Sequence, residues 1–138
     1  MVTPEAADKL DKFFRTFAGG GRPLLLLDYD GTLALFEPLA RMEGLALLEF
    51  EAGLELRVGR NKGGAVEAIL AEAGTGGPVA YLGDDLGDEA AFRAVKRVGP
   101  RGLSVLVRRE WRETAAEVWL RPPGELKGFL ERWIKTRD

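Results

Sequence analysis

The chain has 138 residues, of which 20 are basic and 22 acidic, giving a net charge of −2, and it contains neither cysteine nor histidine. These two absences exclude disulfide bonds, thiol nucleophiles, Cys/His zinc sites and Ser-His-Asp triads. The balanced charge argues against a nucleic-acid partner, and no apolar run approaches the roughly 20 residues that span a bilayer. Without a signal-peptide pattern, we expect a cytoplasmic domain with no membrane partner. Any catalysis then falls to carboxylates, lysines and an oxygen-preferring cation such as Mg²⁺.

The chain begins with a predicted helix followed by a buried strand. Thr3 and Pro4 are typical of a helix start, apolar residues then recur at helical spacing, and the glycines at 19–21 end the helix. The run 23–27 is wholly apolar and is followed by Asp28. Such a run predicts a strand that is buried on both faces, as in a parallel sheet.

The next segment predicts a hairpin and a second helix. Residues 47–50 and 54–58 alternate apolar and charged side chains around a short turn, which predicts a β-hairpin within 46–58. Asn61 is a good helix cap, and apolar residues at helical spacing predict a helix from there to Ala73.

The second half repeats short apolar strands and amphipathic helices. Strands are predicted at 79–82, 103–107 and 118–120, with a helix that ends near Gly99 and a last helix after the prolines at 122–123. This alternation predicts an α/β fold with an open, mainly parallel sheet and flanking helices, in which the whole chain is one domain.

Carboxylates follow the first predicted strand. Asp28 and Asp30 are two residues apart, so in extended chain they point the same way. Two neighbouring carboxylates repel unless a divalent cation or a shared proton compensates. The alternative is an ordinary strand-end turn whose acids are solvated.

A second acidic segment follows the strand at 79–82. Asp84, Asp85, Asp88 and Glu89 lie within it. One or two acids at a helix start are explained by the helix dipole, but four exceed what capping needs. A metal site is the better interpretation, since ligands bind beyond the carboxyl ends of strands in open α/β sheets.

Lys62 stands at the start of the helix predicted after Asn61, followed by two glycines. A cation at this end of a helix opposes the dipole, and glycines weaken the first turn. A lysine held against an anion, with backbone close to the ligand, explains this arrangement. A solvated lysine on a poor helix start is the alternative.

Together these segments resemble the haloacid dehalogenase-like (HAD-like) phosphatases. Residues 28–33 (DYDGTL) resemble the first motif of that superfamily, and Lys62-Gly63 the third. Residues 83–89 (GDDLGDE) resemble the fourth, in the form used by trehalose-6-phosphate phosphatases. The resemblance covers 23–33 and 46 to the end, and it implies a shortened Rossmann-like HAD core.

The resemblance also implies roles for single residues. Asp28 would be the nucleophile that forms an aspartyl-phosphate, Asp30 the general acid and base, and Lys62 the partner of the phosphoryl charge. The implied substrate is trehalose 6-phosphate or a related sugar phosphate, which places the chain in trehalose biosynthesis. The implied cofactor is Mg²⁺, with ligands from Asp28, Asp30, Asp84, Asp85 and Asp88.

The chain departs from the family pattern between Leu33 and Lys62, where it contains neither serine nor threonine. The phosphate-binding hydroxyl of the second motif and most of the substrate cap are therefore missing, and 46–58 is interpreted as the last piece of that cap. A shortened phosphatase, a remnant that binds Mg²⁺ without turnover, and a sequence lacking an internal segment all stay open. Without a cap we expect weak, poorly selective Mg²⁺-dependent activity.

Two alternative functions stay open. One is a non-catalytic module that binds metal, phosphate or a protein partner. The other is a receiver-like phosphoacceptor domain, which the placement of acids after two separate strands disfavours.

A shortened sheet would also expose an edge strand, so self-association is a further expectation. Elsewhere, 108–113 mixes charges and predicts a solvated face, and Trp119 and Trp133 predict core or edge packing.

Overall fold

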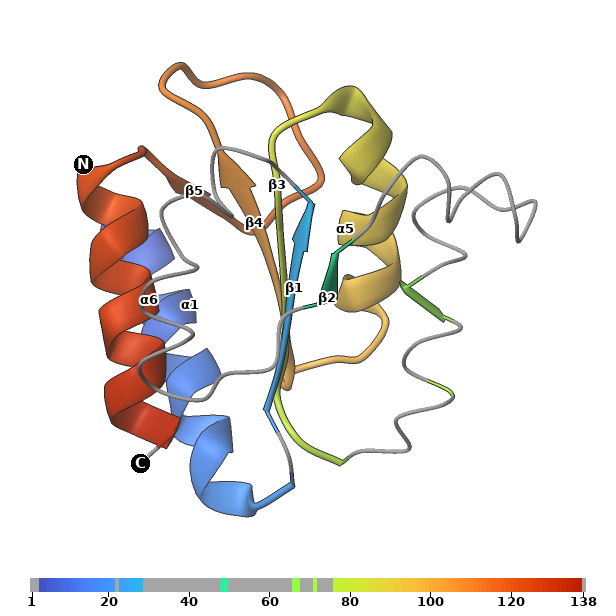
Figure 1. The fold of residues 1–138 in the computed structure, drawn as a ribbon, viewed down its shortest axis with the longest axis vertical. Coiled ribbons are helices and arrows are strands. Elements are labelled where there is room, and N and C mark those ends of the chain that lie inside the picture. Colours follow the sequence, from blue (N-terminus) through green and yellow to red (C-terminus); the bar gives the residue numbers. More distant parts are fainter. Residues whose placement is uncertain are drawn as a thin grey trace.

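The computed structural model shows a parallel β-sheet with helices on both faces (Figure 1). The strands lie in the order β2-β1-β3-β4-β5, and every neighbouring pair is parallel. The predicted α/β fold with a parallel sheet is therefore confirmed. The strands are β1 (Leu24–Asp28), β2 (Leu48–Glu49), β3 (Val79–Gly83), β4 (Gly102–Val107) and β5 (Val118–Leu120). The structure describes residues 3–21, 23–28, 48–49, 66–67, 71 and 76–137.

The helices cover the two faces unequally. α1 and α6 lie side by side on one face, whereas α5 lies on the other (Figure 1). α1 begins at the predicted cap, because Thr3 Oγ1 accepts a hydrogen bond from the Ala6 N–H at 3.1 Å. The helical elements are α1 (Pro4–Arg15), a 3₁₀ turn η1 (Thr16–Gly19), a second 3₁₀ turn η2 (Leu86–Asp88), α5 (Glu89–Lys96) and α6 (Gly124–Arg137). No helix in the described ranges is both long and apolar enough to cross a membrane.

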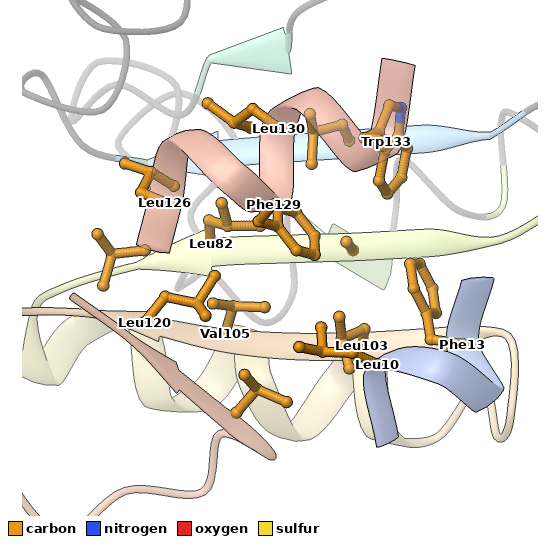
Figure 2. Packing of buried hydrophobic residues seen from close by; sticks show 14 of the residues in the cluster. Leu10, Phe13, Leu82, Leu103, Val105, Leu120, Leu126, Phe129, Leu130 and Trp133 are labelled. Atoms are coloured by element: carbon orange, nitrogen blue, oxygen red, sulfur yellow. The ribbon is translucent and has the colours of Figure 1, made fainter. Parts of the chain in front are cut away.

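The face under α1 and α6 holds a core rich in aromatic rings (Figure 2). Trp133 is 1% exposed, which confirms the packing role predicted for it. Its ring lies 5.0 Å from that of Phe17 and 5.9 Å from that of Phe13, measured between centroids, within the range of favourable aromatic pairs. We call the following residues the aromatic core: Phe13, Phe14, Phe17, Phe129 and Trp133.

The opposite face packs against α5. Tyr81 of β3 and Phe92 of α5 are fully buried and meet edge to face, with ring centroids 5.8 Å apart. Successive side chains of a strand point to opposite faces, so Tyr81 lies on this side while Ala80 and Leu82 belong to the core under α1 and α6. β3 is buried on both faces, as its apolar sequence predicts.

β2 lies beside β1 at one edge of the described sheet. Leu48 and Glu49 pair in parallel with Leu26 and Leu27 of β1. The sequence assigned these two residues to a hairpin within 46–58, whose other residues lie outside the described ranges. The hairpin, and with it the domain organisation, therefore stays a prediction.

The helix predicted after Asn61 is described only at residues 66, 67 and 71, which are helical. Val66 is fully buried and belongs to the cluster under α5. These three positions agree with the predicted helix, and the rest of it lies outside the described ranges.

Candidate functional site

The two acidic segments meet at the carboxyl edge of the sheet. β1 ends at Asp28, whose Cα is paired in the register with that of Gly83 at the end of β3. The backbone therefore brings the two predicted segments to adjacent strand ends, where open α/β sheets bind their ligands. The side chain of Asp28, and all of Asp30 and Lys62, lie outside what the structure describes, so their roles stay predictions.

The residues after β3, 84–89, form what we call the acidic loop. Asp84 is partly buried, Asp85 is exposed, and Asp88 is fully buried. Asp88 Oδ1 accepts a hydrogen bond of 2.6 Å from the Tyr81 hydroxyl, and Oδ2 accepts one of 2.9 Å from the Asp85 N–H. A buried carboxylate needs such donors, so Asp88 fastens the loop to β3.

Gly83 allows this close approach. A Cβ built at Gly83 would overlap with Cγ and Oδ2 of Asp88. The glycine is therefore required by contact with the buried carboxylate, in addition to any freedom it gives the backbone. Position 83 of this chain therefore needs a residue without a side chain for this packing reason.

Glu89 is the fourth acid of the loop, and it has a structural environment of its own. Its Oε1 accepts a hydrogen bond from the Ala115 N–H, and its Oε2 accepts from the Thr114 hydroxyl and from Arg112 Nη1, each at 2.6 Å. Burial by itself raises the pKa of Glu89, but these hydrogen bonds and the Arg112 charge outweigh it, so the pKa lies below its ordinary value. Glu89 thus joins α5 to the segment after β4.

Arg112 corrects the prediction of a solvated face at 108–113. Its side chain is only 16% exposed, as is that of Glu89, with which it forms an ion pair. Arg112 Nη2 also donates to the carbonyl oxygens of Asp85 at 2.8 Å and Asp84 at 3.4 Å. The prediction was wrong for this residue because an alternating-charge segment does not reveal which of its charges meets a buried acid. Arg109 and Glu110 are exposed, as predicted.

A hollow of about 340 Å³ lies next to the acidic loop, at the carboxyl end of β4. Arg108 lines it and donates from Nη1 to the Asp84 carbonyl at 3.4 Å. The lining therefore combines two arginines with two acids, Asp84 and Glu110, and arginine is the residue type best suited to bind an anion such as a phosphate. The hollow is lined by Asp84, Val107, Arg108, Arg109, Glu110 and Pro122.

The acidic loop supplies part of the donor set that Mg²⁺ needs. Carboxylate oxygens are the ligands this cation prefers, and Asp84 and Asp85 lie at the strand edge beside the end of β1. Among the described residues, no three or more acids lie together closely enough to hold a metal ion. The loop therefore offers carboxylates for one side of a Mg²⁺ site, and the further ligands predicted at Asp28 and Asp30 lie outside what the structure describes.

The chain is similar in sequence to several known proteins. The chain is 36% identical over 108 residues to the protein named probable trehalose-phosphate phosphatase 3 of Oryza sativa subsp. japonica, an alignment that covers 71% of this chain. It is 33% identical over 120 residues, or 83% of the chain, to probable trehalose-phosphate phosphatase C of Arabidopsis thaliana. Over 77 residues it is 39% identical to trehalose 6-phosphate phosphatase RA3 of Zea mays.

By its sequence, this chain is similar to members of the trehalose-phosphate phosphatase family. The alignments cover 29%, 33% and 21% of these three relatives, so the chain spans about a third or less of their length. That short span agrees with the shortened family pattern expected from the sequence. No family model matches the chain, and no solved structure matches it.

Sequence reasoning missed Tyr81 and Arg112 as partners of the acidic loop. Tyr81 is the single polar side chain in an otherwise apolar strand, and a buried hydroxyl normally needs a partner. That signal was available in the sequence. For Arg112 the sequence holds no comparable signal, because its partners in the acidic loop lie 23 or more positions away along the chain.

Proposed function

We propose that the chain is a Mg²⁺-dependent phosphomonoester hydrolase of the trehalose-6-phosphate phosphatase type, acting through an aspartyl-phosphate on Asp28. The observation that carries the proposal is the register of β1 with β3, which places Asp28 level with Gly83 at the edge where the acidic loop begins. The relationship to trehalose-phosphate phosphatases and the guanidinium groups beside the loop support it.

In the proposed first step, a carboxylate oxygen of Asp28 attacks phosphorus. The bond from phosphorus to the sugar oxygen breaks, and Asp30 gives its proton to that oxygen. In the second step Asp30 takes a proton from water, whose oxygen attacks phosphorus. The bond from phosphorus to Asp28 then breaks and inorganic phosphate leaves. Lys62 neutralises phosphoryl charge in both steps.

The acids at the edge of the sheet have a binding role in this proposal. Bound Mg²⁺ would supply positive charge against the phosphoryl oxygens. The residues that would hold it are Asp28, Asp30, Asp84, Asp85 and Asp88. Asp88 is the least accessible of the described members, since it is buried and its two oxygens accept hydrogen bonds from Tyr81 and Asp85. Its contribution would therefore be to support the loop or to bind through water.

The proposed substrate is a small phosphorylated sugar, trehalose 6-phosphate or a related compound. Because the segment between Leu33 and Lys62 contains no serine or threonine and is too short for a full cap, we expect weak and poorly selective hydrolysis. A cytoplasmic location and self-association stay predictions. The large apolar side chains exposed in the described ranges are Leu86 and Trp111, and such single residues are normal on a surface.

The experiment is to measure phosphate release from para-nitrophenyl phosphate and from trehalose 6-phosphate, with Mg²⁺ and with a chelator. We expect slow release that needs Mg²⁺ and is lost in Asp28→Asn. Asp8→Asn is the matched control, because Asp8 is an exposed acid on α1 paired only with Lys12 in the described contacts. Phosphate release that persists in Asp28→Asn, or that is unchanged by the chelator, would contradict the proposal.

A second candidate is a non-catalytic module that binds metal or phosphate. The lack of serine and threonine between Leu33 and Lys62, where the second motif and the cap are expected, favours it. Asp88 and Glu89 are also held by hydrogen bonds to protein groups, so these two loop acids need no catalytic explanation. Binding of Mg²⁺ or inorganic phosphate in calorimetry, without release from either ester, would favour this candidate over the enzyme.

A further inference from the structure

The guanidinium group of Arg112 contacts the backbone of the acidic loop. Arg112 Nη2 donates to the carbonyl of Asp85 at 2.8 Å and to that of Asp84 at 3.4 Å. These are the two peptide groups on either side of Asp85. Both carbonyls belong to residues whose carboxylates are proposed to bind Mg²⁺.

Arg112 is itself held in place. Its Nη1 donates to Glu89 Oε2 at 2.6 Å, and Glu89 is fixed in turn by Thr114 and Ala115. Since both charged side chains are only 16% exposed, solvent competes little for these bonds. The planar guanidinium can serve the carboxylate and the carbonyls at once because its donors point in fixed, different directions.

The same loop is held from its other side. The peptide group between Asp84 and Asp85 donates its N–H to Asp88 Oδ2 at 2.9 Å, and its carbonyl accepts from Arg112. That peptide plane is therefore fixed at both ends, and the following plane is fixed by the Asp85 carbonyl. Fixing two successive planes sets the dihedral angles of Asp85 and the direction of its Cβ.

We propose that Arg112 is a positioning residue, which orients the Asp85 carboxylate by holding the two peptide groups that flank Asp85. The proposal rests on the proposed function, in which this carboxylate binds Mg²⁺. Groups that hold metal ligands in place typically change metal affinity 10–100-fold when they are removed.

Electrostatics alone makes the opposite prediction. Arg112 carries a positive charge next to the loop, and its removal would strengthen the attraction between the loop and a cation. Weaker Mg²⁺ binding in Arg112→Gln is therefore the signature of positioning. Arg112→Lys keeps the charge and the pairing with Glu89, but an ammonium group cannot reproduce the fork of donors that reaches both carbonyls.

The experiment titrates Mg²⁺ into the full chain by calorimetry and measures unfolding in urea with a chelator present. We expect Arg112→Gln to raise the Kd for Mg²⁺ by about 10–100-fold, and Arg112→Lys to raise it while changing the unfolding midpoint less than Arg112→Gln does. Arg97→Gln is the matched control, since Arg97 pairs with Glu67 on the surface at the other end of α5. We expect its Kd to equal that of the wild type.

The outcomes separate the two proposals. A wild-type chain that binds no Mg²⁺ overturns the proposed function and this inference with it. A wild type that binds, with both Arg112 variants binding equally well or more tightly, overturns the inference alone. If Mg²⁺ affinity falls only in those variants whose unfolding midpoint also falls, Arg112 has a purely structural role. That result also overturns the inference. If Arg112→Gln is unfolded in chelator, the Mg²⁺ Kd and the unfolding midpoint of Arg112→Lys are judged by the same criteria.

Discussion

On the face of the sheet under α1 and α6, the rings of the aromatic core surround Trp133, whereas at the carboxyl end of β3 a few short hydrogen bonds hold Asp88 and Glu89. Apolar burial is non-directional and is spread over many atoms. Hydrogen bonds to buried carboxylates depend on single donors at fixed distances. The core should therefore tolerate changes of similar size and shape, and the loop should respond to the loss of single atoms.

The largest expected effect is in the aromatic core. Trp133→Ala removes a side chain that is 1% exposed and contacts four other rings. We expect the free energy of unfolding in urea to fall by about 3–5 kcal/mol, through lost burial and the cavity left behind. Trp111→Ala is the control, since Trp111 is 60% exposed, and should change stability by less than about 0.5 kcal/mol. Similar losses in the two variants would contradict the packing described for Trp133.

At the loop, Tyr81→Phe removes one hydroxyl and keeps the ring that packs on Phe92. Asp88 then has one donor fewer, and we expect a loss of about 1–3 kcal/mol in the free energy of unfolding. The check is a double-mutant cycle with Asp88→Asn, measured by urea denaturation with chelator present. Strictly additive effects of the two changes would mean that the hydroxyl and the carboxylate do not interact.

Gly83→Ala adds a single carbon where Asp88 leaves no room. We expect it to destabilise the chain by about 1–3 kcal/mol, because either the strand end or the carboxylate has to shift. Gly128→Ala is the matched control: Gly128 lies in α6, and a Cβ there meets no atom within 4 Å. It should be stabilising by up to about 1 kcal/mol through helix propensity. Thermal unfolding midpoints that move in the same direction for both would refute this reading of the contact.

The smallest effect is expected for a polar contact on the α1–α6 side. Arg132 pairs with Asp11 at 2.8 Å, but the two side chains are 42% and 50% exposed. Arg132→Gln should lower the free energy of unfolding by only about 0.2–1 kcal/mol, less than Arg112→Gln. The difference between wild type and Arg132→Gln should shrink further in 1 M salt because exposed charges are screened. A loss as large as that of Arg112→Gln would show that burial does not govern the strength of these pairs.

Most of the fold could be predicted from the sequence because its signals are local. The strands β1, β3, β4 and β5 appear as short apolar runs, and α1 begins at its predicted Thr3 cap. For Leu48-Glu49 the alternating pattern correctly predicted an extended segment but did not reveal its parallel pairing with β1. An alternating pattern indicates that a segment is extended, but it does not indicate which strand that segment pairs with.

The candidate site divides in the same way. The sequence by itself determined that carboxylates follow two buried strands and that cysteine and histidine chemistry is excluded, and it indicated the family through the motifs those carboxylates form. Only the tertiary structure decided that β1 and β3 are neighbours, so that Asp28 and Gly83 lie level at one edge. It also decided which loop acids are held by Tyr81 and Arg112. Residue types and short-range spacing can be read directly from the sequence. Burial and long-range hydrogen bonds form only when segments distant along the chain pack together.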